Sequence, residues 1–165
     1  MIKNLREGIL AKLKVQEFDS EPESDFEAKT VFLGGTCNDS TWRATLIEKL
    51  KVDYFNPVVD DWNEEAQQQE IEHREHDKFV LYVITPLMTG VYSIAEVVDD
   101  SNKRPEKTLF CVLETDAKKS FNKHQLKSLN MVKSMVLKNG AKVFDNLDDV
   151  ATFLNATKKR LIKLL

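Results

Sequence analysis

The sequence has few cysteines and no long hydrophobic run. Its two cysteines, Cys37 and Cys111, are too few for the disulfide framework of a small secreted domain. Neither lies at metal-ligand spacing from another cysteine or a histidine. No stretch approaches the roughly 18 apolar residues of a membrane span. Residues 1–13 interleave charged with apolar side chains, unlike the core of a signal peptide. We therefore expect a cytoplasmic protein, outside the membrane, with two free thiols.

Neither sign of charge dominates the sequence. The 165 residues include 24 Lys and Arg against 27 Asp and Glu, a formal net charge of -3. Binding to a nucleic-acid polymer or to an anionic membrane needs clustered positive charge, so we expect neither as the main task. The chain is close to the roughly 150 residues of a typical domain. One globular domain that takes a small neutral or anionic ligand fits these numbers.

The first 29 residues differ in pattern from the rest. Apolar residues at 2, 5, 9, 10 and 13 have helical spacing and predict an amphipathic helix that ends near residue 16. Residues 17–29 are rich in charge and have no apolar period, which is typical of a solvated linker. We divide the chain into an N-terminal helix and linker, 1–29, and an α/β domain, 30–165.

From residue 30 onward, short apolar runs alternate with helical stretches. The runs at 31–36, 52–55, 79–84, 108–113 and 141–144 predict five strands. The run 79–84 is apolar throughout, which favours a central strand buried on both faces. Between the strands we expect helices, the first of them capped by Asp39 or Ser40. Right-handed crossovers then give a three-layer, flavodoxin-like (Rossmann-like) α/β sandwich with a five-stranded parallel sheet in the order 2-1-3-4-5.

This architecture predicts where a ligand would lie. Ligands of open parallel sheets bind beyond the carboxyl ends of the strands, where the topology switches, here between the first and third strands. The segments 34–38, 56–62, 85–96 and 114–116 converge there. Gly34 and Gly35 let the backbone approach a ligand closely, although a tight turn explains them equally well. The dinucleotide fingerprint and the lysine loop of ATPases are absent, so we expect no cofactor.

Glu96 is the most informative side chain at this edge. If Ser93 caps its helix, Glu96 is the third residue and closes a capping box on the backbone of the cap. Alternatively, the carboxylate faces the crevice, is held ionised by the helix start and by Tyr92 or Ser93, and attacks an electrophilic carbon. A glycosidic carbon is the natural target of such a nucleophile.

A series of short motifs joins these residues. They are Val31-Phe32-Leu33-Gly34-Gly35-Thr36, Trp42-Arg43, Phe55-Asn56-Pro57, Asp60-Asp61-Trp62, Asp77, and Ser93-Ile94-Ala95-Glu96. In this order and spacing they resemble the nucleoside 2-deoxyribosyltransferase-like family. The resemblance implies a flavodoxin-like fold in which Glu96 attacks C1′ of a 2-deoxynucleoside, releases the base and forms a deoxyribosyl ester. It also implies a homo-oligomer.

A second acid is needed to protonate the leaving base. Asp60, Asp61, Glu70 and Glu72 are the candidates. The family often has an acid seven or eight residues before the aspartate that opens the third strand, which implies Glu70.

Several further groups are candidates for substrate binding. Asn56 can bond a sugar hydroxyl or a base edge, although a turn before Pro57 explains it as well. Trp62, in a polar loop, is a better stacking residue than Trp42, which lies on an apolar helix face. The predicted substrate-binding set is Gly34, Gly35, Thr36, Asn56, Asp60, Asp61, Trp62, Thr85, Tyr92 and Ser93.

Three other polar positions have structural interpretations instead. Asp77 stands at the amino end of a strand, far from the crevice, so we expect a structural role. His73 and His76 have no third ligand nearby in the sequence, so we expect surface histidines and no metal site.

The sequence departs from the transferase pattern around Glu96. Many members have an aspartate and a glycine where Gly90-Val91-Tyr92 stand, and a glycine where Val97-Val98 stand. The substrate therefore remains a nucleoside or a nucleotide, and the reaction either transfer or hydrolysis. The alternatives are a catalytically inactive nucleotide-binding or sensing module, an NAD-glycohydrolase-like enzyme, and an interaction domain without a ligand.

Overall fold

The structure is a computed structural model that describes residues 26–61 and 63–162. The predicted N-terminal helix, most of the linker and Trp62 lie outside these residues. No helix within the described ranges is long and apolar enough to cross a membrane.

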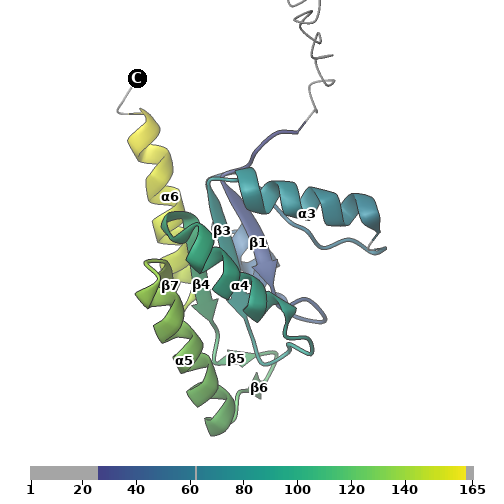
Figure 1. The fold of residues 1–165 in the computed structure, drawn as a ribbon, viewed down its shortest axis with the longest axis vertical. Helices are drawn as coiled ribbons and strands as arrows, with labels where there is room; N and C mark the ends of the chain where they lie inside the picture. Colours follow the sequence, from purple (N-terminus) through teal and green to yellow (C-terminus); the bar gives the residue numbers. More distant parts are fainter. Residues whose placement is uncertain (1–25, 62, 163–165) are drawn as a thin grey trace, which may run out of the picture.

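A five-stranded parallel sheet forms the centre of the fold (Figure 1). Its strands are β1 (Val31–Gly35), β2 (Tyr54–Phe55), β3 (Phe79–Ile84), β4 (Thr108–Val112) and β7 (Lys142–Phe144). Their order is β2-β1-β3-β4-β7, which confirms the predicted 2-1-3-4-5 arrangement. Val31 pairs with Phe79 and with Tyr54. The topology therefore switches between β1 and β3, as predicted.

Helices cover both faces of the sheet. Helices α2 (Trp42–Ile47) and α6 (Leu147–Ile162) pack on one face, where Leu33, Leu81 and Leu109 point. Helices α4 (Tyr92–Lys103) and α5 (Lys123–Lys138) pack on the other, over Phe32, Tyr82 and Phe110. This alternation along each strand buries both faces and confirms the three layers.

Helix α3 (Glu64–His76) stands apart from this core. In Figure 1 it projects sideways from the amino end of the sheet. Asn63 caps its start by accepting the N–H of Ala66. Of its thirteen residues, His73 alone is buried. The last turn of α3 is thus the part that meets the rest of the protein.

Backbone geometry after β1 explains the two glycines. Gly35 has a φ of +118°, and a Cβ on it would lie 2.1 Å from the carbonyl oxygen of Val83. The next amide, of Thr36, donates to that same oxygen at 2.8 Å. Gly35 therefore serves the tight turn and the close approach of β1 to β3, which only glycine permits at this φ.

Two local details differ from the sequence predictions. Helix α2 begins after Thr41 with no side-chain cap, so neither Asp39 nor Ser40 caps it, and the hydroxyl of Ser40 instead bonds Asp116. A short hairpin, β5 (Thr115–Asp116) and β6 (Lys119–Ser120), follows β4. It was not predicted, and its turn residues Ala117 and Lys118 both have positive φ, as a type I′ turn requires.

Candidate functional site

A cavity of about 160 Å³ lies between the loop after β1 and the start of α4. This is the switch point of the topology, at the carboxyl end of the sheet. Four of the predicted binding residues, Gly35, Thr36, Tyr92 and Ser93, are in its wall. The remaining lining residues are Cys37, Asn38, Ile84, Met88, Thr89 and Gly90. Among the described residues this wall carries hydroxyl, amide and apolar groups and no Lys or Arg.

Hydrogen bonds between two loops shape one side of this cavity. Asn38, at a φ of 55°, donates its amide Nδ2 to the carbonyl of Leu87 at 2.8 Å and to the hydroxyl of Thr89 at 3.3 Å. The Thr36 hydroxyl accepts the N–H of Thr85 at 3.0 Å. Thr85 is fully buried and its own hydroxyl accepts the N–H of Leu87. Thr85, which was predicted to bind substrate, therefore holds the loop after β3 in place and is not among the residues that line the cavity.

Arg43 holds the end of β1 and the loop that follows it, which forms part of the cavity wall. Its guanidinium is buried and donates to the carbonyls of Leu33, Gly35 and Thr36 at 3.0, 3.2 and 2.7 Å. Burial lowers the pKa of Arg43, and the neighbouring Cys37 and Glu70 oppose that change. Sequence reasoning noted Arg43 only within a motif and assigned it no role.

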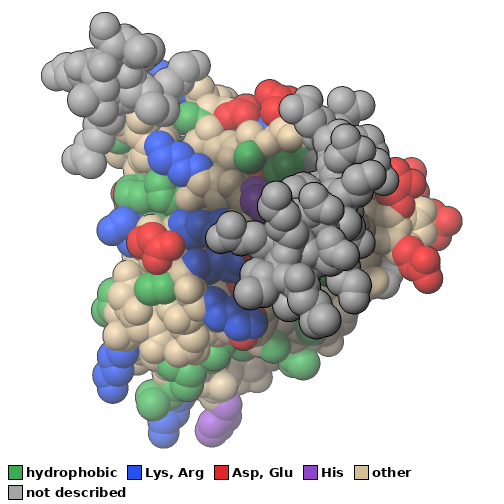
Figure 2. Space-filling view, turned by 45° about the horizontal axis from the view of Figure 1, so that its top comes forward, with side chains coloured by type: hydrophobic (Ala, Val, Ile, Leu, Met, Phe, Trp, Pro, Cys, Tyr) green, Lys and Arg blue, Asp and Glu red, His purple; other side chains and the backbone are tan. Residues whose placement is uncertain are grey.

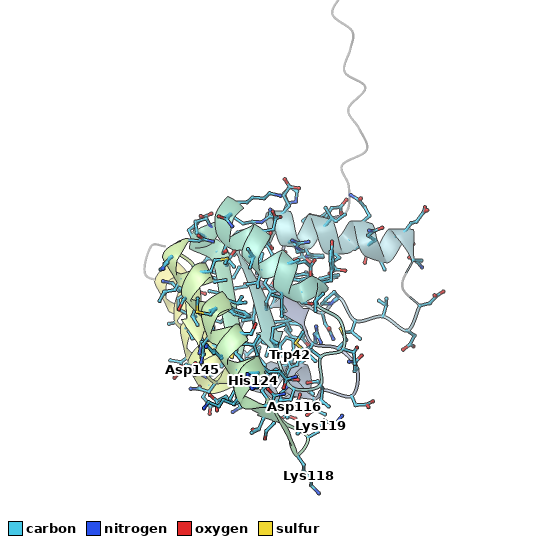
Figure 3. The ribbon with its side chains drawn as sticks, turned by 60° about the horizontal axis from the view of Figure 1, so that its bottom comes forward. Trp42, Asp116, Lys118, Lys119, His124 and Asp145 are labelled. Atoms are coloured by element: carbon cyan, nitrogen blue, oxygen red, sulfur yellow. The ribbon has the colours of Figure 1, made fainter. Side chains whose placement is uncertain are left out.

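Trp42 lies beside Arg43 and belongs to the core, as predicted. It is buried, and its indole Nε1 donates to the carbonyl of Thr36 at 2.7 Å. Figure 3 turns this end of the molecule forward, with Trp42 inside and Lys118 pointing outward from the tip of the β5–β6 hairpin.

Glu96 does not cap its own helix. The N-cap of α4 is Val91, and no side chain bonds the cap, so the capping-box interpretation is wrong. Residue Glu96 is 6% exposed, and its carboxylate oxygen Oε1 accepts a hydrogen bond from Nη1 of Arg74 at 2.7 Å. Within the described residues, Oε2 has no hydrogen-bond partner.

The position of Glu96 relative to the cavity follows from helical spacing. Tyr92 and Ser93 line the cavity, and Glu96 comes three residues after Ser93, on the same helix face one turn further on. Glu96 itself is not among the lining residues. Glu96 is therefore one helical turn from two residues of the cavity wall, and its own side chain is not part of that wall.

Burial makes the carboxyl group of Glu96 a weaker acid than an exposed glutamate. It raises the pKa of Glu96 from 4.5 to about 7; Arg74 lowers this pKa, whereas Glu70 and Asp100 raise it. A carboxyl group with such a pKa is populated in both protonation states near neutral pH. Perturbation by burial together with specific charges is typical of functional sites.

The guanidinium of Arg74 also binds Asp100. Its Nη2 and Nε lie 3.1 and 3.3 Å from the carboxylate oxygens of Asp100. The hydroxyl of Tyr82 donates to Asp100 at 2.6 Å, and Nε of Arg104 donates at 2.9 Å. Burial would raise the pKa of Asp100, but these three donors outweigh burial and lower it. Sequence reasoning missed Arg74, Tyr82, Asp100 and Arg104.

Glu70, the predicted second acid, lies near this cluster. It is half-buried on α3, four residues before Arg74 and so on the same helix face. Its charge acts on both Glu96 and Arg43. Glu72, another candidate, accepts a hydrogen bond from Gln68.

The loop after β2 shows a turn at Asn56. Asn56, Asp60 and Asp61 are exposed, and the side-chain oxygen of Asn56 accepts the N–H of Val58 at 3.2 Å, which matches the turn interpretation. None of the three lines the cavity, nor does Gly34. Tyr92, in contrast, stands at the cavity wall with 72% of its surface exposed.

Asp77 and His73 form a structural pair at the opposite end of the sheet. Asp77 is 1% exposed and accepts the N–H of Lys29 at 2.6 Å and Nδ1 of His73 at 2.9 Å. His73 stacks on Phe55 at 3.6 Å between ring centroids. Asp77 is structural, as predicted. The prediction of a surface histidine is wrong for His73, because its ring is buried, and correct for His76.

Figure 2 turns this amino end of the sheet forward and shows Lys and Arg side chains gathered on it. At this end, Lys107 donates to the carbonyls of Glu75 and Asp77 at 2.7 and 2.9 Å. No group of three or more His, Cys, Asp or Glu side chains in the described ranges is arranged to hold a metal ion.

Comparison with known proteins identifies the family. The family model described as "Nucleoside 2-deoxyribosyltransferase like" matches residues 28–116. The matched segment runs from the residues before β1 into the β5–β6 hairpin, and it includes Glu70, Arg74, Glu96 and every described residue of the cavity wall. No curated protein sequence matches the chain. Because more than half of the 165 residues match, the chain belongs to the nucleoside 2-deoxyribosyltransferase-like family.

Proposed function

We propose that this protein cleaves or transfers the N-glycosidic bond of a (deoxy)nucleoside or nucleotide through a covalent sugar ester on Glu96. The observation that carries the proposal is the buried carboxylate of Glu96, one helical turn after residues that line a cavity at the switch point. One of its oxygens is bonded, and the other has no partner in the described chain. The family match supports the same chemistry.

The first step forms the ester. The Oε2 oxygen of ionised Glu96 attacks C1′ of the sugar, and the bond from C1′ to the base nitrogen breaks. The electron pair of that bond goes to the base, which takes a proton from Glu70. Glu70 donates in its protonated form, and we assign it this role because it lies close enough to Glu96, on the facing helix, for the two carboxyl groups to interact.

The second step regenerates the enzyme. Water, or a second base, attacks C1′ and the sugar–oxygen bond of the ester breaks. The electron pair returns to Glu96, and Glu70 takes the proton of the attacking group. Water as acceptor makes the protein a hydrolase, and a base makes it a transferase.

The size of the cavity indicates which part of the substrate it holds. Its volume of about 160 Å³ is below the roughly 300–1,000 Å³ of pockets for whole drug-sized ligands. We assign it to the sugar, with Ser93, Thr89 and Asn38 as partners for the hydroxyls. The exposed ring of Tyr92 then offers a stacking surface to the base at the mouth.

The test is release of free base. The full chain is incubated with 2′-deoxynucleosides, their 5′-monophosphates and NAD, with and without a second base, and products are separated by chromatography. We expect base release from at least one deoxynucleoside or deoxynucleotide, and loss of activity by at least about a thousandfold in Glu96→Gln, as for removal of a nucleophile. Glu75→Gln, which changes an exposed glutamate of α3, is the matched control. Full activity in Glu96→Gln contradicts the proposal.

One observation favours a second candidate, a nucleotide-binding module without activity. Glu96 is paired with Arg74 and does not line the cavity, as in a site that keeps its pocket but no longer catalyses. This alternative predicts no base release from any substrate in the panel, together with ligand affinity that Glu96→Gln leaves unchanged. A homo-oligomer and the division of the chain into residues 1–29 and 30–165 remain predictions from the sequence.

A further inference from the structure

Arg74 links the candidate nucleophile to a rigid part of the core. Its guanidinium lies between two carboxylates of α4, with Nη1 2.7 Å from Glu96 and Nη2 3.1 Å from Asp100. The side chain of Arg74 is 13% exposed, that of Glu96 7% and that of Asp100 0%. All three groups are therefore largely removed from water. In such a buried environment, charge-assisted hydrogen bonds are strong and directional.

We propose that Arg74 is a positioning residue for the reaction. By holding Oε1, it turns Oε2 of Glu96 toward the sugar and keeps the carboxylate ionised for attack. This inference rests on the proposed function and deepens it, because it assigns the two oxygens of the nucleophile different tasks.

The other contacts of Arg74 explain why it can fix an orientation. Asp100 receives Nε as well as Nη2, so the planar guanidinium is held along two edges. Asp100 in turn is held by Tyr82, which is fully buried in β3, the central strand of the sheet. Arg74 therefore cannot follow Glu96 if the carboxylate rotates, and the bond to Oε1 selects one rotamer.

The charges of this cluster suit the formation and breakdown of an ester. Before reaction, the cations of Arg74 and Arg104 face the anions of Glu96 and Asp100. Esterification removes the charge of Glu96, but Arg74 keeps Asp100 as its counter-ion, so no buried cation is left without a partner. When the ester breaks, the returning negative charge meets the guanidinium that already bonds Oε1. Arg74 thus favours departure of the sugar from Glu96.

A pH profile separates this role from a purely structural one. The charged and titratable groups that act on Glu96 are Arg74 and Glu70 from α3, Asp100 from its own helix, and Tyr82 from β3. Of these, Arg74 is the cation. Its removal, in Arg74→Met, should therefore move the acid limb of the kcat profile upward, by roughly one to three pH units for loss of a close opposite charge. Because the pKa of Glu96 is about 7 in the wild type, we expect kcat at pH 7 to fall roughly 5- to 500-fold, in step with the smaller ionised fraction.

The matched control is Arg104→Met. Arg104 binds the same carboxylate, Asp100, but has no contact with Glu96. The Arg104→Met variant should therefore leave the acid limb of the kcat profile at the wild-type pH. The conservative variant Arg74→Lys should restore part of the shift, since it keeps the charge but cannot bind both carboxylates as a fork. If Arg74→Met fails to fold, the same measurements are made on Arg74→Lys instead.

A second readout does not depend on turnover. The pKa of Glu96 is followed by carbon NMR of its labelled carboxyl group in the folded, substrate-free protein and in both Arg74 variants. A higher pKa in the Arg74 variants than in the wild type and in Arg104→Met supports the inference. Equal pKa values in all of them overturn it. If the pKa changes as expected but no substrate is cleaved, the proposed function fails while the electrostatic hold of Arg74 on Glu96 stands.

Discussion

Glu96 should destabilise the folded protein at neutral and higher pH, and Glu96→Gln should remove that cost. The pKa of this carboxyl is raised from 4.5 to about 7 by burial. Between these values the folded chain binds more protons at residue 96 than the unfolded chain, so the free energy of unfolding falls as pH rises through this window. At 1.36 kcal/mol per pH unit, a rise from 4.5 to about 7 amounts to roughly 3 kcal/mol when the window is fully crossed.

Urea unfolding of the wild type and of Glu96→Gln at pH 5 and pH 8 measures this effect. Glutamine lacks the titration, and Arg74 keeps Asp100 as its partner in the variant. The stability of Glu96→Gln relative to the wild type should therefore rise by about 2 to 3 kcal/mol between the two pH values. Glu75→Gln serves as the control and should show no such change. A difference between Glu96→Gln and wild type that is independent of pH refutes the reasoning, because Glu96 would then titrate as it does in the unfolded chain.

Three other changes test the geometry of the site and the fold. Gly35→Ala should lower the free energy of unfolding in urea by about 3 kcal/mol or more, because the added Cβ would overlap the Val83 backbone at a φ of +118°. The control is Gly90→Ala, which should cost far less because no atom lies within 4 Å of its added Cβ. Iodoacetamide at pH 7.5 should alkylate the exposed Cys37 of the cavity wall and block base release, and bound substrate should protect this thiol. Cys111 is buried and its pKa is raised to about 12, so peptide mapping should find it unmodified. Asn122→Ala removes the two hydrogen bonds that the Asn122 side chain accepts from the N–H groups of His124 and Gln125 at the start of α5. It should lower stability by about 1 kcal/mol, seen as a shift of the urea midpoint.

The sequence was sufficient for the sheet because burial imposes a simple pattern on parallel strands. Residues 79–84 are apolar throughout, and β3 is buried at every position on both faces. The β5–β6 hairpin escaped prediction for the opposite reason. Each of its strands has two residues, too few for an alternation to appear. Its turn uses Ala117 and Lys118 at positive φ instead of the Asn-Gly type of pair that marks such turns.

The candidate site was predictable only in part. Glu96 and Glu70 were predicted from motifs that resemble the family and stay predictions, whereas the cavity does lie at the predicted switch point. Arg74 was missed because α3 is polar on nearly every side, so nothing in the sequence separates a buried arginine from its solvated neighbours. Its role depends on a partner helix, which sequence reasoning cannot place. The one usable signal was the spacing of Glu96 and Asp100, two acids one helical turn apart on a helix whose intervening Val97 is buried.

The central claim is that the sugar becomes covalently attached to Glu96. The most direct measurement is acid quenching of the protein during turnover of a 2′-deoxynucleoside, followed by peptide mass spectrometry. The account predicts one deoxyribosyl group on the peptide that contains Glu96, its loss on longer incubation with water or a second base, and no adduct in Glu96→Gln. Base release without any adduct, or a sugar found on Glu70 instead, would contradict it.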